Sequence, residues 1–116
     1  MEFHDELKLN IHSYIRLVHR LTKKFPKEEL YGIISQLRRA TMSIMLNYIE
    51  GYARRNGDGC KVYNNFLNIS YGSLKESKYL VYFSFDEKYI NEEEYNECQK
   101  YCDKIGKMIW SLLDKK

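Results

Sequence analysis

The stretch SQLRRATMSIMLNYIEGYARR, residues Ser35 to Arg55, decides how this chain folds, because it carries two stripes at helical spacing. The stripe that suits a helical core consists of Ile34, Leu37, Thr41, Ile44, Tyr48 and Gly51. The neighbouring polar stripe consists of Gln36, Arg39, Ser43, Asn47, Glu50 and Arg54. Between Met42 and Ala53 there are also more apolar residues than one packing face can use. We therefore expect a long helix that more than one neighbour covers.

Length and composition indicate one helix-rich globular domain over residues 1–116. The chain of 116 residues is 44% hydrophobic and 30% charged and contains a single proline, which is typical of a folded helical protein. No apolar run approaches the roughly 20 residues that a membrane span requires. Acidic residues stand where a secretory signal would have its apolar core. We therefore expect a cytoplasmic protein without membrane contact.

Hydrophobic periodicity predicts four long helices, because apolar side chains recur three and four residues apart in four segments. The linkers between them are short. Pro26 suits the first turn of a helix, and Arg55 to Gly59 is rich in residues that favour turns. The helices are expected at residues 4–24, 27–54, 60–85 and 91–114. Four long helices with short loops are typical of an all-α, antiparallel up-down-up-down four-helix bundle.

Three local patterns in the second half of the chain bear on these helices. Asn91 followed by Glu94 is a capping-box pattern, which gives the surrounding acidic cluster a structural explanation. The segment YLVYFSF, Tyr79 to Phe85, has the composition of a strand, but the continuing helical period favours a helix. Gly72 and Ser73 lie inside the third predicted helix, where glycine costs about 1 kcal/mol relative to alanine. Close approach of another helix would justify that cost.

Nothing in the sequence indicates an active centre. Cys98 and Cys102 fall on the apolar side of the fourth helix without a histidine nearby, so we interpret them as buried hydrophobic residues and not as zinc ligands. The chain contains no glycine-rich phosphate loop, HExxH motif or CxxC pair. No glycine-rich turn accompanies the histidines of the first helix to offer an oxyanion site. We therefore expect no catalytic residue, no metal and no cofactor.

Basic residues are concentrated in the first half of the chain, which contains every arginine, whereas Asp86 to Glu97 is acidic. Guanidinium groups bind phosphate through a planar fork, so a polyanion is the partner to consider. The candidate nucleic-acid-binding residues are Lys8, His12, Arg16, His19, Arg20, Lys23, Lys24, Lys27, Arg38, Arg54 and Arg55. The alternative is that these side chains only solvate exposed helix faces.

The 11 tyrosines offer a second feature of nucleic-acid-binding proteins, because their rings can stack on bases. Four of them occupy apolar positions of the predicted helices instead, namely Tyr14, Tyr48, Tyr63 and Tyr95. We therefore interpret many of the tyrosines as core or interface residues.

Several segments together resemble one known family. They are FPKEELYG at residues 25–32, SQLRRA at 35–40, SI..N..EG at 43–51, the Arg54–Arg55 pair and FLNISYGSLKE at 66–76. The family consists of small four-helix-bundle proteins encoded in intervening sequences of bacterial large-subunit ribosomal RNA genes. It includes the accessory variability determinant of diversity-generating retroelements. Met45 and Ile49 stand where the family often has proline and alanine.

The resemblance implies a ring-like homopentamer with a basic surface for RNA or DNA and a reverse transcriptase as a partner. The chain would then be a non-enzymatic nucleic-acid-binding accessory or scaffold protein. The alternative is a structural homo-oligomer that binds protein only.

The polar stripe of the second helix has three candidate roles, as a ligand site, a subunit contact or a buried polar network. The excess of apolar residues around it, together with the resemblance, favours a subunit contact. The candidate interface residues are Gln36, Arg39, Ser43, Asn47, Glu50, Gly72, Ser73 and Glu76.

Overall fold

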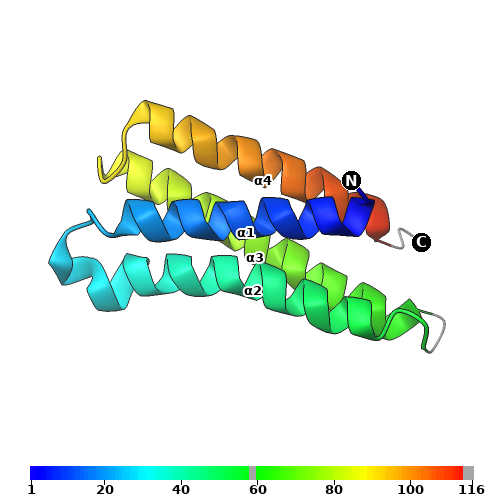
Figure 1. The fold of residues 1–116 in the computed structure, drawn as a ribbon. Coiled ribbons are helices and arrows are strands. Elements are labelled where there is room, and N and C mark those ends of the chain that lie inside the picture. Colours follow the sequence, from blue (N-terminus) through cyan, green and yellow to red (C-terminus); the bar gives the residue numbers. More distant parts are fainter. Residues whose placement is uncertain (58–59, 114–116) are drawn as a thin grey trace.

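The computed structural model describes residues 1–57 and 60–113, and all the long elements in them are helices. These are α1 (Phe3–Thr22), α2 (Ser35–Ala53), α3 (Lys61–Asp86) and α4 (Glu92–Leu112), drawn in Figure 1. The described part of the chain contains no strand, and Tyr79 to Phe85 belongs to α3. The prediction of an all-α protein with four helices is confirmed. The predicted loop positions 58–59 and the predicted helix end at 114 lie outside the described residues.

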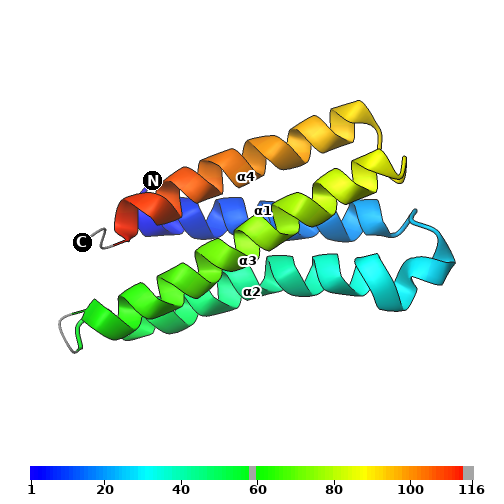
Figure 2. The same ribbon diagram turned by 180° about the vertical axis from the view of Figure 1, so that it is seen from behind.

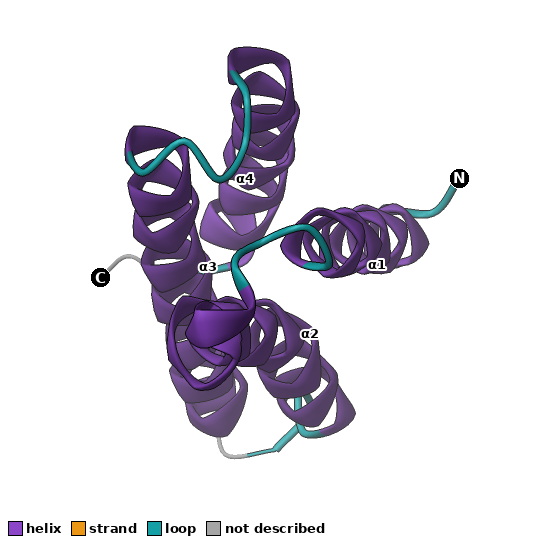
Figure 3. Cartoon of the chain, turned by 90° about the vertical axis from the view of Figure 1, so that its left-hand side faces the viewer, coloured by secondary structure: helices purple, strands orange, loops and turns teal. Residues whose placement is uncertain are grey.

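Each long helix packs on two of the others. Helix α1 contacts α2 and α4, and α3 contacts the same two helices. Consecutive helices are linked at alternate ends of the molecule, as Figures 1 and 2 show. The end view in Figure 3 shows the four helices grouped around a shared interior, a bundle-like arrangement. No helix in the described ranges is long and apolar enough to cross a membrane.

The apolar stripes predicted from the sequence meet in this interior. Leu7, Ile11 and Tyr14 of α1 and Ile44 and Tyr48 of α2 are at most 1% exposed. Fully burying one large apolar side chain contributes roughly 1.5–3 kcal/mol, so these stripes account for much of the driving force for folding. The helices α3 and α4 supply further core residues, among them Leu67, Leu74, Val81, Cys98, Cys102, Ile105 and Ile109.

The two cysteines of α4 are part of this core, as predicted. Cys98 and Cys102 are buried, and burial is the main cause that raises the pKa of the Cys98 thiol to about 12. The thiol of Cys102 also has a raised pKa, again chiefly because it is buried, and it donates a hydrogen bond to the hydroxyl of Tyr14 at 3.2 Å. Both thiols are therefore protonated near neutral pH and act as small apolar groups.

The connection between α1 and α2 is not the continuous α-helix from residue 27 that the sequence predicted. A 3-10 turn, η1 (Lys27–Glu29), leads into a π-helical turn, η2 (Leu30–Ile34), before α2 begins at Ser35. Gly32 has φ −108° and ψ −114°, outside the helical region, so the chain kinks there. The tight 3-10 turn is followed directly by the wide π-helical turn. Despite this irregular backbone, Ile33 and Ile34 are buried in the core.

The start of α4 has the predicted capping box. Asn91 Oδ1 accepts a hydrogen bond from the Glu94 backbone N–H at 2.8 Å, and the Glu94 side chain accepts one from the Asn91 N–H at 2.9 Å. Two backbone donors that the helix itself leaves unpaired are thereby satisfied.

Within the single chain the helices approach closely at Gly51, and of the predicted pair Gly72 and Ser73 only Ser73 meets a neighbouring helix. A Cβ atom at Gly51 would lie 2.8 Å from the Cβ of Phe66 on α3, whereas a Cβ at Gly72 would meet nothing within 4 Å. The next residue, Ser73, makes the helix contact instead, through a 2.7 Å hydrogen bond between its Oγ and that of Ser43. Gly72 therefore lies on the outer side of α3.

We expect alanine at these two glycines to change stability in opposite directions. Gly51→Ala places a methyl group too close to Phe66, and such overpacking lowers the free energy of unfolding by at least about 1 kcal/mol. Gly72→Ala adds a methyl group in open space and removes the cost of glycine in a helix, so it raises the single chain's free energy of unfolding by about 0.5–1 kcal/mol. Urea unfolding measures both, at dilutions where the midpoint no longer depends on protein concentration. A destabilised Gly72→Ala variant under those conditions would contradict this placement.

Candidate nucleic-acid-binding and subunit interfaces

Five of the candidate nucleic-acid-binding residues recur four and three residues apart along α1 and form a basic stripe on the side that faces away from the core. Its members Lys8, His12, Arg16 and Lys23 are exposed, and His19 is half-buried. The core residues of α1 lie three and four residues apart on the other side, so the same helical period separates the two faces. Lys8 forms an exposed ion pair with Asp5 at 3.9 Å, a type of contact that is weak in water.

A surface hollow of about 460 Å³ brings four of the candidate residues together. They are Arg16, His19, Arg20 and Lys23 of α1. Helix α4 supplies Tyr101 and Glu97 to the same hollow, and the carboxylate of Glu97 lies 4.0 Å from the Arg20 guanidinium. Both partners of that pair are largely exposed, so it restrains Arg20 only slightly. We call this surface the α1 hollow.

The α4 side of the α1 hollow could not be predicted from the sequence. Tyr101 is half-buried and packs near the ring of Tyr14, with 6.1 Å between the ring centroids. Only the packing of α1 on α4 brings it next to Arg20, because the two residues are far apart in the sequence. No signal within α4 distinguishes Tyr101 from the other tyrosines.

Three further candidate residues, Arg38, Lys24 and Lys27, do not line the α1 hollow. Arg38 Nε donates a hydrogen bond to Thr22 Oγ1 at 2.9 Å, so this guanidinium ties α2 to the end of α1. Lys24 pairs with Glu94. Partial burial raises the pKa of that carboxyl, but hydrogen bonds from Lys24 and from the Asn91 backbone outweigh it and lower the pKa below its ordinary value. Lys27 is exposed in η1.

Arg54 and Arg55 lie at the opposite end of the molecule. Helix α1 has 20 residues, which corresponds to about 30 Å at 1.5 Å per residue, and the end of α2 lies beside the start of α1 in Figure 1. Arg54 pairs with Glu50, four residues before it, and its guanidinium lies 5.6 Å from the ring centroid of Phe66. The guanidinium of Arg55 lies over the ring of Tyr52, with 3.8 Å between Cζ and the ring centroid. The structure thus places Arg54 and Arg55 apart from the α1 hollow, whose lining does not include Lys8 or His12 of α1 either.

The predicted interface residues also divide into two groups. Ser43, Asn47 and Ser73 join in a polar network between α2 and α3, because Asn47 Nδ2 donates to the backbone and side-chain oxygens of Ser43, both at 2.9 Å, and Ser43 bonds to Ser73. These three residues match the polar-network role that the sequence left open. The other five are open to solvent in the single chain, namely Gln36, Arg39, Glu50, Gly72 and Glu76.

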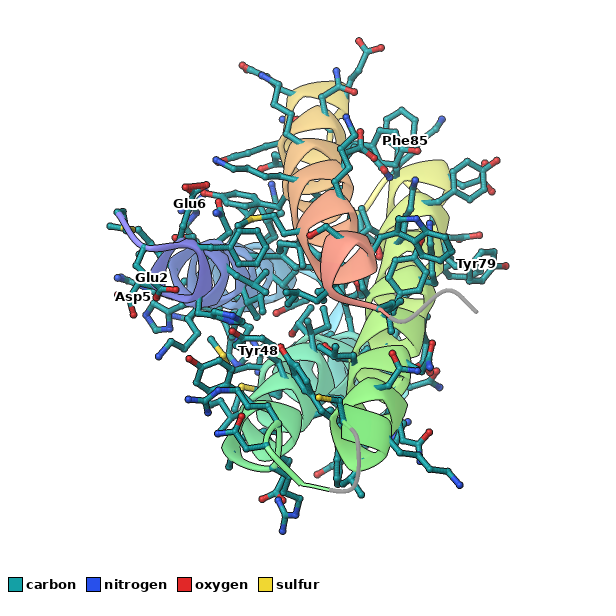
Figure 4. All side chains as sticks on the ribbon, turned by 90° about the vertical axis from the view of Figure 1, so that its right-hand side faces the viewer. Glu2, Asp5, Glu6, Tyr48, Tyr79 and Phe85 are labelled. Atoms are coloured by element: carbon teal, nitrogen blue, oxygen red, sulfur yellow. The ribbon has the colours of Figure 1, made fainter. Side chains whose placement is uncertain are left out.

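Helix α2 also carries an exposed row of apolar residues, separate from its polar stripe. Met42, Leu46 and Ile49 are 41%, 55% and 48% exposed and recur four and three residues apart, opposite the buried side of the helix. Ile69 and Tyr79 of α3 are exposed as well. Figure 4 shows Tyr79 pointing away from the helices, in contrast to Tyr48 between them. The three residues of α2 form a continuous apolar row on one helix face, a feature that can mark an interaction site.

Comparison with known proteins places the chain in a family. The sequence profile of the 23S rRNA-intervening sequence proteins matches residues 9–111, which is most of the chain. A crystal structure of a protein with unknown function from the S23 ribosomal protein family of Bacteroides thetaiotaomicron is similar, with a TM-score of 0.80 and 20% sequence identity over 94% of this chain and 99% of that chain. At that identity the likeness shows the fold alone. No curated protein matches the chain. Because the profile matches most of the chain, this chain belongs to the 23S rRNA-intervening sequence protein family.

Proposed function

We propose that this protein is a non-enzymatic accessory or scaffold protein that binds nucleic acid as a homo-oligomer. The observation that carries the proposal is the α1 hollow, where arginine, lysine and histidine side chains of α1 meet Tyr101 of α4. Cationic groups that converge on an open surface attract phosphate, and an aromatic ring among them offers a base a stacking surface. Glu97 is the one acidic residue that lines the hollow, so positive charge dominates it.

The resemblance to the accessory variability determinant supports a more specific version of this role. In that version the protein is an antiparallel four-helix bundle that assembles into a ring-like homopentamer and carries RNA or DNA to a reverse transcriptase in the cytoplasm. The exposed row of Met42, Leu46 and Ile49 supports the assembly, because a subunit contact would remove it from water. Gly72 would let a second subunit approach α3 closely, since no atom of its own chain lies near its missing side chain.

The row on α2 and the α1 hollow use different parts of the surface, so assembly and nucleic-acid binding can occur together. The second candidate function is a structural homo-oligomer that contacts protein only, and the same apolar row favours it. The two candidates differ in whether the α1 hollow binds phosphate.

We expect the α1 hollow to bind RNA or DNA in a salt-dependent manner. Arg16→Glu combined with Lys23→Glu reverses two of its charges and should weaken binding at least about tenfold. Each lost phosphate contact should also reduce the slope of log affinity against log salt by about 0.7 for a single strand. Mobility-shift titrations at several salt concentrations measure both quantities. Lys24 is left unchanged because it supports the capping box through Glu94.

The matched control is Lys61→Glu combined with Lys100→Glu, which changes the net charge equally with exposed residues outside the hollow. Equal loss of binding in both double variants would show a general charge effect and no site. An absence of binding by the unchanged protein at low salt would exclude the first function and leave the structural oligomer.

We expect the exposed apolar row to hold the subunits together. Leu46→Glu should reduce the mass of the protein in solution, because it places a charge in an apolar contact. The matched control is Leu9→Glu, at a leucine that is similarly exposed but lies on α1. Sedimentation or light scattering measures the mass of each form. A single-chain mass for the unchanged protein would overturn the oligomer in both candidate functions.

A further inference from the structure

We propose that a second hollow, between α3 and α4, binds a nucleotide, with the base against aromatic side chains and the phosphate held by lysines. The hollow has a volume of about 320 Å³, which is within the range of small-molecule sites. It is open to solvent and lies on the side of α4 that faces α3, whereas the α1 hollow borders α4 on the side of α1. The site goes beyond the proposed function, because a nucleotide can occupy it whether or not the α1 hollow binds nucleic acid.

Two aromatic rings form the part of the hollow that would hold the base. Tyr71 of α3 and Trp110 of α4 have ring centroids 5.6 Å apart and planes inclined at 44°. Tyr71 is half-buried, and Trp110 is 49% exposed, an unusual situation for the largest apolar side chain. The rings are tilted and not stacked face to face, so a planar ligand can pack against an aromatic face at the hollow. Bases bind to such platforms with little dependence on sequence.

Gly106 keeps the hollow open beside these rings. A Cβ atom there would lie 3.4 Å from Leu74 Cδ2 and 4.0 Å from Tyr71 Cε1, so any larger side chain would extend into the space next to Tyr71. Glycine is unfavourable within a helix, yet it occupies this position inside α4. The absence of a side chain leaves room for a planar group against Tyr71.

The charges around the rings select an anion. Three lysines and one aspartate line the hollow, a net charge of +2. Lys78 pairs with Asp103 at 3.7 Å, and the Lys75 ammonium lies 5.2 Å from the ring centroid of Tyr71. Within the described residues neither Lys75 nor Lys107 forms an ion pair with a carboxylate. Two ammonium groups are therefore available for a phosphate.

Aromatic rings and unpaired lysines in one hollow favour a ligand that is both planar and anionic. A nucleotide combines the two properties, and it can be a free mononucleotide or one residue of a single strand. A base within a duplex would not fit, since its faces are covered by its neighbours in the stack. Aromatic residues alternating with cationic ones are the usual composition of surfaces for unpaired nucleic acid.

Trp110 is the single tryptophan of the chain, so its fluorescence reports on this hollow directly. We expect uridine monophosphate to quench it in a saturable manner, with uridine and inorganic phosphate each binding at least about tenfold more weakly, because each lacks one half of the contacts. An oligouridine strand forms the second arm. Quenching by both ligands supports a nucleotide site that accepts either a free mononucleotide or a residue of a single strand. Quenching by the strand alone identifies single-stranded nucleic acid as the ligand.

Variants separate this site from the α1 hollow. Lys107→Glu, at an exposed residue that should not affect folding, should weaken quenching at least about fivefold, whereas Lys100→Glu on the outer side of α4 should leave it unchanged. Gly106→Leu should block the ligand, with circular dichroism to check that the variant is folded. Arg16→Glu with Lys23→Glu should not alter the quenching by the mononucleotide, even if it abolishes binding of RNA. An absence of quenching by either ligand, or equal quenching in Lys107→Glu and the unchanged protein, would overturn the proposal.

Discussion

The close packing of α2 on α3 through small residues is the constraint on which the rest of the structure depends. Gly51 leaves room for Phe66, Ser43 bonds to Ser73, and Ser70 Oγ donates a 2.7 Å hydrogen bond to the backbone oxygen of Ile44. Side chains of this size let two helix backbones approach, and the hydroxyls of Ser43, Ser70 and Ser73 form hydrogen bonds between the two helices. The two helices make the most extensive helix–helix contact of the molecule.

This packing decides which side of α2 faces outward. With α3 on one flank and α1 on the other, the core stripe of α2 is buried and its large apolar residues Met42, Leu46 and Ile49 remain in water. The polar stripe of α2 partly serves the contact with α3, through Ser43 and Asn47. The rotation of α2 about its own axis thus sets both its apolar outer face and the polar flank that contacts α3. The proposal of subunit assembly rests on the apolar outer face.

The two hollows follow from a second aspect of the packing, the position of α4 between α1 and α3. On one side Tyr101 of α4 lies beside the arginines of α1, and on the other Trp110 of α4 lies beside Tyr71 and the lysines of α3. Each hollow combines an aromatic side chain with cationic groups from a neighbouring helix. The half-buried aromatic residues thus belong both to the helix contacts and to the surface, where their polar or planar parts can meet a ligand.

The sequence alone determined the four helices, their core stripes, the capping box at Asn91 and the family, because helical period and local hydrogen bonding are properties of contiguous residues. It did not reveal the wide turn at Leu30 to Ile34. The expected helical period is 3.6 residues per turn, whereas this segment contains first a tighter 3-10 turn and then a wider π-helical turn. It also could not tell that Gly51 and not Gly72 faces another helix of the same chain, or that Tyr71 and Trp110 meet. Those facts depend on how far each helix is rotated about its axis relative to helices distant in the sequence. Interdigitating side chains set that rotation, and it exists only in the folded chain.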